Sequence, residues 1–238
     1  MLPFLPEQPI RFPPTHQALS EPNGLLAAGG ALTSEWLLAA YRRGIFPWYS
    51  PGEPILWWSP DPRCVLPVDQ VHISRSLRKT MKKPHWSVRF DTAFAQVIRL
   101  CAQTPRRGQD GTWIDQAMVE AYSALHQMGY AHSVEVFWHD ELVGGLYGVQ
   151  IGRMFFGESM FSLRPDASKI ALVHLCHQLQ QWGFEFIDCQ VETAHLRRMG
   201  AVLLSRHEFE HALQRLLHVP FAQQKWTDGQ NSSLNACF

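Results

Sequence analysis

The sequence predicts an α+β fold in which helices surround a mixed β-sheet, preceded by a small N-terminal domain. The first observation is the element order from residue 63 onward, where apolar segments of strand period are interspersed with longer segments of helix period. The second is a run of three strands with no helix between them, which favours antiparallel pairing. The third is a length of 238 residues, 46% of them hydrophobic and 18% charged, which suits one good-sized domain with an appendage.

The composition restricts the partners and the compartment. The formal net charge is zero, so a polyanion would have to be met by a local basic patch. The five cysteines form neither a C-x-x-C pair nor a regular framework, which is typical of free thiols in a reducing compartment. The N-terminal stretch has no signal-peptide pattern, and no apolar run reaches the roughly 18 residues of a membrane span. We therefore expect a cytoplasmic protein without membrane contact.

Residues 1–62 are rich in proline and aromatic residues, and they predict a small loop-rich N-terminal domain. One helix is expected there, beginning at the cap Thr33 or Ser34 and ending before Gly44. Residues 63–238 are then expected to form the main domain.

The main domain is expected to begin with a strand near Cys64. The further elements expected are a helix at 74–83, a strand at 86–90, helices at 91–102 and 115–128, strands at 131–138, 142–150 and 154–162, a helix at 167–182, a strand at 184–191, a helix at 192–199, a strand at 201–204 and a final helix. This order is similar to that of the GCN5-related acyltransferase superfamily. A coenzyme A enzyme of that superfamily would carry a glycine-rich pyrophosphate loop after the three consecutive strands, where this chain has LRPDASK. Coenzyme A is therefore not the expected donor.

The third of the consecutive strands carries a carboxylate that its pattern does not explain. Strict alternation places Met154, Phe156, Glu158, Met160 and Ser162 on one face. Burying Glu158 between two apolar neighbours would cost several kcal/mol unless it meets a partner or a ligand. The alternative is an edge strand whose glutamate lies in water.

A second strand, FEFIDCQV, repeats this feature. Alternation places Asp188 and Gln190 on the same face as Phe184 and Phe186. If the two strands are neighbours, Glu158, Asp188 and Gln190 converge in one apolar cleft. Such a cleft, with a few placed polar groups, is typical of a substrate pocket.

The helix expected at 74–83 carries a basic stripe without any acid. Its members are Arg75, Arg78, Lys79, Lys82 and Lys83, which fall on one side of a helix that turns by about 100° per residue. A solvated face is the ordinary interpretation, but surface helices normally mix both charges because like charges at i and i+4 repel. The stripe favours contact with a phosphate backbone, which would be independent of base sequence and strongly salt-dependent.

Two catalytic motifs are matched only superficially. His207, Glu208 and His211 fit the H-E-x-x-H zinc signature, but Ser205 and Glu208 form a capping box, and a helical wheel turns both histidines away from the apolar stripe. No metal is therefore expected. The segment GESMF begins like a serine nucleophile elbow but lacks the closing glycine. Cys189 is expected to be a packed thiol.

Aromatic residues form a further group with two interpretations. The group comprises Tyr41, Trp48, Trp57, Trp58, Trp113 and Tyr122. About half should belong to the core. The others would suit a stacking platform for a nucleotide base, worth about 1 to 3 kcal/mol per base.

Eight segments in chain order resemble the motifs of the bacterial leucyl/phenylalanyl-tRNA:protein transferase family. They are EPNGLLAAGG (21–30), YRRGIFPWYSPGEPILWWSPDPR (41–63), HISRS (72–76), GTWI (111–114), AYSALHQMGYAHSVEV (121–136), ELVGGLYG (141–148), FFGESMFS (155–162) and IDCQ (187–190). The resemblance implies transfer of Leu or Phe, with Met as a further donor that fits the same shape, from aminoacyl-tRNA to the α-amine of a protein beginning with Arg or Lys. It implies no metal and no soluble cofactor.

The resemblance also implies roles for individual residues. Asp188 would accept hydrogen bonds from the incoming amine, Gln190 would fix Asp188 and the substrate, and the negative charge of Glu158 would favour a cationic N-terminus. The Leu or Phe pocket would be lined by Phe156, Met160 and Ile187, the terminal adenosine would be held by Tyr41, Trp48, Trp113 and Tyr122, and the acceptor stem by the basic stripe. Alternation puts Ile187 on the opposite face, so either its strand bulges or the register is off by one.

Two other functions stay open at this point. One is a related peptidyl transferase that uses another tRNA or carrier donor. The other is a non-catalytic module that captures basic N-termini with Glu158 and Asp188. A monomer is expected.

Overall fold

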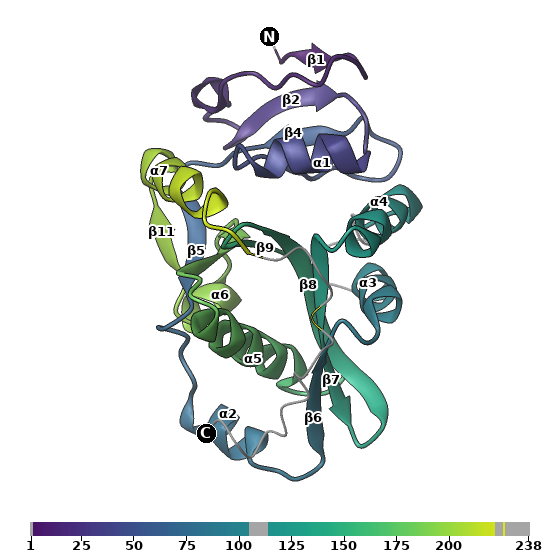
Figure 1. Ribbon diagram of the computed structural model, residues 1–238, viewed down its shortest axis with the longest axis vertical. Helices are drawn as coiled ribbons and strands as arrows, with labels where there is room; N and C mark the ends of the chain where they lie inside the picture. Colours follow the sequence, from purple (N-terminus) through teal and green to yellow (C-terminus); the bar gives the residue numbers. More distant parts are fainter. Residues whose placement is uncertain (1, 105–113, 222–225, 227–238) are drawn as a thin grey trace.

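Two β-sheets organise the chain in the computed structural model, which describes residues 2–104, 114–221 and 226 (Figure 1). A four-stranded sheet of order β1-β2-β4-β3 lies in the N-terminal segment, and a seven-stranded sheet of order β11-β5-β10-β9-β8-β7-β6 forms the centre of the remainder. In the larger sheet β10 pairs in parallel with β9, whereas the other neighbouring strands are antiparallel. The expected α+β fold around a mixed sheet is confirmed.

The N-terminal sheet is built from short strands. They are β1 (Phe4–Leu5), β2 (Leu25–Gly29), β3 (Phe46–Pro47) and β4 (Leu56–Trp58). A 3₁₀ turn occupies Thr15–Gln17. Helix α1 (Ser34–Tyr41) begins at the expected cap, because the Thr33 hydroxyl accepts a hydrogen bond from Trp36 N. The sheet itself was not expected, since most of its strands, at two or three residues, are too short to show a period in the sequence.

The seven-stranded sheet contains every strand expected after residue 62. Its strands are β5 (Arg63–Pro67), β6 (Trp86–Phe90), β7 (Ala131–Trp138), β8 (Glu141–Ile151), β9 (Met154–Ser162), β10 (Phe186–Gln190) and β11 (Val202–Leu204). The predicted antiparallel run β7-β8-β9 is confirmed. Gly152 takes a φ of 57° in the tight turn between β8 and β9, a conformation that favours glycine.

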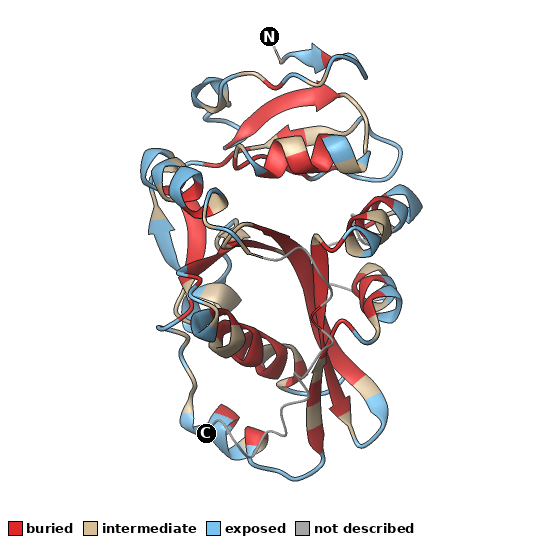
Figure 2. Cartoon of the chain, viewed as in Figure 1, coloured by how far each residue is buried: buried red, intermediate tan, exposed pale blue. Residues whose placement is uncertain are grey.

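Helices cover both faces of the seven-stranded sheet (Figure 1). Helices α3 (Phe94–Gln103) and α4 (Gln116–Gln127) pack on one face, and α5 (Ala167–Gln181) crosses the other beside α2 (Arg75–Met81). Each face buries its own apolar cluster, so the central strands are buried along most of their length (Figure 2). The chain closes with α6 (Ala194–Arg198) and α7 (Arg206–Leu217). None of the described helices has both the length and the apolar character needed to cross a lipid bilayer.

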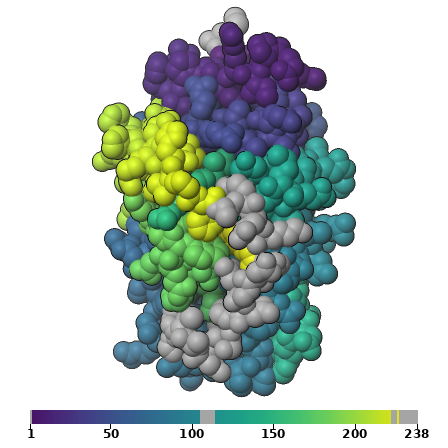
Figure 3. Space-filling model, viewed as in Figure 1, coloured from purple at the N-terminus to yellow at the C-terminus, as the bar shows by residue number. Residues whose placement is uncertain are grey.

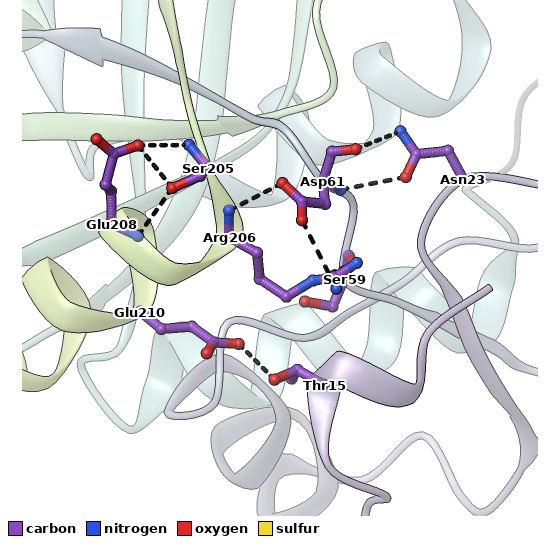
Figure 4. A network of polar contacts seen from close by, with 8 residues as sticks. All are labelled: Thr15, Asn23, Ser59, Asp61, Ser205, Arg206, Glu208 and Glu210. Atoms are coloured by element: carbon purple, nitrogen blue, oxygen red, sulfur yellow. Dashed lines mark hydrogen bonds and ion pairs between the residues drawn. The ribbon is translucent and has the colours of Figure 1, made fainter. Parts of the chain in front are cut away.

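Polar contacts connect α7 to the N-terminal segment (Figure 4). The backbone N–H of Arg206 donates to Asp61 Oδ1 at 3.0 Å, and its guanidinium Nη2 donates to the Ser59 carbonyl at 2.7 Å. The Thr15 hydroxyl donates to the Glu210 carboxylate further along the helix. The yellow α7 and the purple N-terminal segment accordingly adjoin on the molecular surface (Figure 3).

The first turn of α7 confirms the predicted capping box. The Ser205 hydroxyl accepts from Glu208 N at 3.2 Å, and the Glu208 carboxylate accepts from Ser205 N at 2.8 Å. The glutamate of the H-E-x-x-H match is therefore occupied in capping the start of the helix. This contact fixes the helix start at the point where the N-terminal segment docks.

Candidate active site

A β-bulge at Glu158 determines which side chains of β9 share a face. The ladder pairs Tyr147 with Ser159 and Gly148 with Gly157, leaving Glu158 as the additional residue. Phe156 packs in the cluster under α3 and α4, whereas Met160 packs with Phe155 in the cluster under α5. The alternation that placed Phe156 and Met160 on one face is therefore wrong, because one extra residue in a strand reverses the faces beyond it.

A second bulge lies in β10. Asp188 pairs with Val65 but Gln190 pairs with Cys64, and Gln190 has a left-handed φ of 64°, which is uncommon for any residue other than glycine. The bulge turns Gln190 away from the face of Asp188. Ile187 packs on the α5 side, opposite Phe186, as alternation within β10 placed it, and it lines the cavity as the family resemblance required.

A cavity of about 640 Å³ opens where the two bulges meet, between β9, β10, α5, α6 and the segment after β3. Its apolar wall includes Leu146, Phe155, Met160, Leu172, Leu175 and Ile187. Glu158 and Gln190 both line it. Among the described lining residues Glu158 is the only carboxylate, and no Lys or Arg is present. The predicted convergence of Glu158 and Gln190 on an apolar pocket is thus found.

Three donors from three separate elements hold the Glu158 carboxylate. Oε1 accepts from the Tyr41 hydroxyl of α1 and from Gln190 Nε2 of β10, both at 2.7 Å. Oε2 accepts from the Tyr122 hydroxyl of α4 at 2.8 Å. The two tyrosine oxygens are themselves 2.5 Å apart. The carboxylate is therefore fixed in position before any substrate arrives.

Burial sets the electrostatics of this group. The pKa of Glu158 is raised to about 7. Removal from water is the main cause and nearby Asp188 adds to it, while the hydrogen bonds from Tyr41, Tyr122 and Gln190 act in the opposite direction. Burial also raises the pKa values of Tyr41 and Tyr122 well above the ordinary tyrosine value, so both hydroxyls remain protonated donors. Near neutral pH Glu158 can both lose and accept a proton.

Asp188 does not line this cavity, and the prediction that it opens into the same cleft is wrong. Its side chain is fully buried and forms two hydrogen bonds with Arg63, from Nε to Oδ1 at 2.8 Å and from Nη2 to Oδ2 at 2.7 Å. Oδ1 also accepts the backbone N–H of Gln190 at 2.9 Å. Asp188 therefore holds the bulge that positions Gln190. The Arg63 guanidinium is in turn covered by the rings of Phe46 and Phe209.

The family model described as leucyl/phenylalanyl-tRNA protein transferase matches residues 65–214, and the model of its N-terminal domain matches residues 30–61. The chain belongs to this family. It is therefore a transferase, of the aminoacyltransferase class. Two relatives named leucyl/phenylalanyl-tRNA--protein transferase come from Hydrogenovibrio crunogenus and Nitrosomonas europaea. They are 57% and 60% identical, over 94% and 90% of this chain and 88% and 91% of their own lengths.

Two solved structures resemble this transferase at low sequence identity. L-PGS from Bacillus licheniformis gives a TM-score of 0.41 at 10% identity, over 67% of this chain and 66% of its own. A GCN5-related N-acetyltransferase-like protein from Streptococcus suis gives a TM-score of 0.32 at 12% identity, over 72% of this chain and 64% of its own.

The aromatic residues of the transferase divide into buried and accessible ones. Tyr41 and Tyr122 are fully buried, so the expectation that their rings hold an adenosine is wrong for this conformation. Trp48 lines the cavity and is 38% exposed, with Trp58 beside it at a ring distance of 5.5 Å. Trp113 lies outside the described residues.

Part of the basic stripe of the transferase lies on α2: Arg75, Arg78 and Lys79 are in the helix, Lys82 is its C-cap, and Lys83 follows it, because the helix ends two residues before the predicted bound. All five of its side chains are exposed, whereas Leu77 and Met81 on the opposite side are buried. The Ser74 hydroxyl caps the helix by accepting from Leu77 N. The spacing argument is thus confirmed for Arg75, Arg78 and Lys79, while Lys82 and Lys83 are exposed at the end of the helix.

Metal ligation finds no support in the part of the transferase that the structure describes. No group of three or more His, Cys, Asp or Glu side chains there is placed to hold an ion. His207 and His211 instead border a separate hollow of about 330 Å³ with Arg43 and Glu210.

Two residues at the site were missed by the sequence interpretation. Arg63 had one available signal, a charged residue inside an otherwise apolar strand segment, RCVLP. His195, which lines the cavity from α6, had no distinguishing pattern.

Proposed function

We propose that this transferase joins Leu or Phe, carried as an ester on tRNA, to the α-amine of a protein that begins with Arg or Lys. The observation that carries the proposal is the Glu158 carboxylate, held by three donors at the edge of an apolar cavity. The catalytic domain would be residues 63–238. The N-terminal domain, residues 1–62, would contribute Tyr41 and Trp48.

The cavity suits an apolar donor side chain. Leu, Phe or Met would lie among Met160, Ile187 and the neighbouring apolar residues of the wall. Phe156 would support that wall from behind, since it is buried on the opposite face of β9. Discrimination between similar side chains would be limited to about 1 to 3 kcal/mol per missing group. Branching at Cβ, as in Ile, would be disfavoured by shape.

The reaction requires little acid–base assistance. The α-amine attacks the ester carbonyl carbon, the C–N bond forms, and the C–O bond to the tRNA ribose breaks. A free α-amine has a pKa of about 8, so about a tenth of it is neutral at pH 7. Holding amine and ester in contact can supply effective molarities of about 10⁵ M or more. Positioning is therefore the main task of the site.

Glu158 would receive the proton that the amine loses. Its pKa of about 7 is close to the pH at which the reaction runs, which is optimal for a group that accepts and returns a proton. The Gln190 amide donates to Glu158 through Nε2, which leaves its carbonyl oxygen available to orient the amine. Asp188 would act as a positioning residue, because it contacts Gln190 N and does not line the cavity.

The charge of the cavity favours a cationic acceptor. Glu158 is the only carboxylate, and Lys and Arg are absent, among the described residues that line it. An N-terminal Arg or Lys would place its side chain and α-amine in a negative field, whereas an N-terminal Asp would be repelled. This reasoning supports the choice of Arg or Lys over an acidic residue.

The donor tRNA would be held outside the cavity. The exposed ring of Trp48 offers a stacking surface at the cavity edge for the terminal base. Arg75, Arg78, Lys79, Lys82 and Lys83 would contact the phosphates of the acceptor stem. A tRNA donor implies a cytoplasmic location, and nothing in this scheme requires more than a monomer.

The decisive experiment is incubation with radiolabelled Leu-tRNA and a protein that begins with Arg. We expect label in that protein and little in a matched protein that begins with Asp, or when Ile-tRNA replaces Leu-tRNA. Equal labelling of the Asp protein would reject the acceptor assignment. Tight binding of the Arg peptide with no transfer would indicate a non-catalytic module, and labelling from an acyl-coenzyme A alone would indicate another donor.

Substitutions test the two parts of the site separately. Gln190→Ala and Asp188→Asn should each lower transfer to the Arg protein, and near wild-type rates in both would reject their roles. Lys79→Glu with Lys82→Glu should weaken aminoacyl-tRNA binding and lower its salt dependence, by about one unit of slope per lost phosphate contact. An altered preference between Leu and Phe in that variant would contradict placement of the stripe on the tRNA backbone.

A further inference from the structure

Two cysteines lie side by side next to the catalytic bulge. Cys64 is on β5, and the β10 ladder pairs it with Gln190, while Asp188 pairs with Val65. Cys189 is thus the additional residue of the bulge and is adjacent to Cys64 across the two strands. Gln190 is directly opposed to Cys64, at the usual Cα separation of about 4.5 to 5.5 Å, and Cys189 precedes it in a bulge where two residues face one. A disulfide spans Cα separations of about 4.4 to 6.8 Å.

The two thiols also face one another. Contact with Cys189 lowers the pKa of Cys64, and the same contact together with burial raises the pKa of Cys189 well above the ordinary value. Cys64 is therefore the more nucleophilic sulfur of the two, which suits it to the second, sulfur–sulfur step, whereas access decides which sulfur a peroxide meets first. The Cys189 thiol also lies 3.7 Å from the Ile187 carbonyl oxygen.

Access differs between the two sulfurs. Cys189 is partly exposed and lines the cavity, whereas Cys64 is 1% exposed. A small molecule in the cavity would meet Cys189 first, with Cys64 directly behind it. The other two cysteines in the described part of the chain, Cys101 and Cys176, are buried in helices and do not line the cavity.

We propose that Cys64 and Cys189 are an oxidisable thiol pair, which hydroperoxides entering the cavity close to a disulfide and so reversibly lower transfer. In the first step a peroxide oxygen passes to Cys189 Sγ, giving a sulfenic acid and water. In the second step Cys64 Sγ attacks that sulfur, the S–S bond forms, and hydroxide leaves and takes up the Cys64 proton as a second water. Two thiols and one hydrogen peroxide thus give one disulfide and two waters.

The consequence for the active site follows from the position of Cys189. It separates Asp188 from Gln190, so bonding its sulfur to β5 changes the bulge that Asp188 fixes through Gln190 N. Gln190 Nε2 lies 2.7 Å from Glu158 and depends on that bulge for its direction. A displacement of about 1 Å in a positioned group can cost about 100-fold in rate. Oxidation should therefore act on transfer itself.

The covalent step can be tested without any assay of transfer. Cys237 lies outside the described residues, so it is replaced by serine in every protein tested, which leaves Cys64, Cys101, Cys176 and Cys189. After hydrogen peroxide, blocking of free thiols and digestion, mass spectrometry should detect the Cys64 and Cys189 peptides linked together, and dithiothreitol should separate them. Sulfenic or sulfinic acid at Cys189 without that link would overturn the proposal.

The effect on activity rests on the proposed function, so it is measured in parallel on the same samples. Transfer of radiolabelled Leu to the Arg protein should fall about tenfold or more as the link forms and return with dithiothreitol. A quantitative link with unchanged transfer would overturn the regulatory half of the proposal. Absence of transfer in the reduced protein would reject the proposed function, while the peptide result would still decide the thiol chemistry.

Variants of Cys64 separate the disulfide from other oxidation. Cys64→Ala, and Cys64→Ser as a variant that keeps the volume, should transfer normally when reduced and lose the dithiothreitol-reversible inhibition. Cys101→Ala is the matched control, a buried cysteine removed on α3, and it should respond as the parent does. Reversible inhibition of both Cys64 variants to the same extent as the parent would overturn the proposal.

Discussion

Glu158 and Glu135 are two strand glutamates of one sheet, the first half-buried and the second fully buried, and they differ in what surrounds them. Each has a pKa raised to about 7, chiefly by burial. Glu135 on β7 is fully buried and accepts hydrogen bonds from Thr92 N, Thr92 Oγ1 and Ser133 Oγ, all from neighbouring segments. Glu158 is held by side chains of three distant elements and borders the cavity.

The contrast shows that a raised pKa reports burial and does not by itself identify a catalytic group. Glu135 binds Thr92 just before α3, where a carboxylate stabilises the unpaired N–H groups of a helix start, and it does not line the cavity. Glu158 has the same acidity with an open space in front of it. Access to that space is the property that distinguishes the two sites.

The largest effect expected from this contrast is on transfer. Glu158→Gln keeps the shape but removes the charge and the proton acceptor, so we expect kcat/KM for radiolabelled Leu transfer to fall about 10³-fold. Glu135→Gln should stay within about threefold of the wild type, because it alters no group that touches substrate. Far-UV circular dichroism of both variants checks that the fold is retained. Loss of transfer in Glu135→Gln alone would reverse the assignment.

Local patterns in the sequence were enough to predict some elements of the fold. The alternation in MFFGESMFS located β9 within its observed bounds, and the S-x-x-E pattern located the start of α7, because both signals are local. The four-stranded N-terminal sheet gave no such signal, because a strand such as Phe46–Pro47 is shorter than one period. Its stability comes from packing against segments that are distant in the sequence.

The sequence predicted which residues gather at the site but not how their side chains are placed. Glu158 and Gln190 were expected in a shared cavity because polar residues interrupted apolar strands. Asp188 was misplaced relative to Gln190, since the bulge between them adds one residue to the strand, moves Gln190 to the other face and leaves no mark in the residue types. Its partner Arg63 is 125 positions away in the sequence, a separation that a single sequence does not reveal.

A second expected effect concerns stability, in which the two glutamates should behave alike. A folded-state pKa of about 7 against an ordinary 4.5 means that the folded protein binds the proton of Glu135 more tightly. This contribution to stability is complete below about pH 4.5 and is lost as the pH rises through about 7. Glu135→Gln lacks the titration, so its free energy of unfolding relative to wild type should rise over that interval by about 3 kcal/mol. Urea unfolding at pH 5 and pH 8 measures it.

Glu158→Gln should show the same sign of pH dependence in urea, since the pKa of Glu158 is raised in the same direction. The two variants would then show the same pH dependence of stability but very different rates of transfer. If the difference in free energy of unfolding between variant and wild type were the same at pH 5 and pH 8 for both variants, neither carboxyl would be protonated near neutrality. In that case the proton-acceptor role of Glu158 would need a different titrating group.

The smallest effect expected is from Tyr41→Phe and Tyr122→Phe. Each removes one hydrogen bond that favours the charged form of Glu158, so the pKa of Glu158 should rise, by about one unit. Transfer would then fall about fivefold near pH 7 and recover at higher pH, where the carboxyl is ionised again. Tyr49→Phe is the matched control, because the Tyr49 hydroxyl donates to Asp115 at 3.3 Å and does not contact Glu158.

The pH profile of transfer distinguishes this explanation from direct contact. If the tyrosine hydroxyls act only by setting the acidity of Glu158, the acidic limb of the profile moves to higher pH and the plateau rate is kept. If either hydroxyl touches the substrate, the plateau falls and the limb does not move. The second outcome would assign to α1 and α4 a part in catalysis that the burial of both rings argues against.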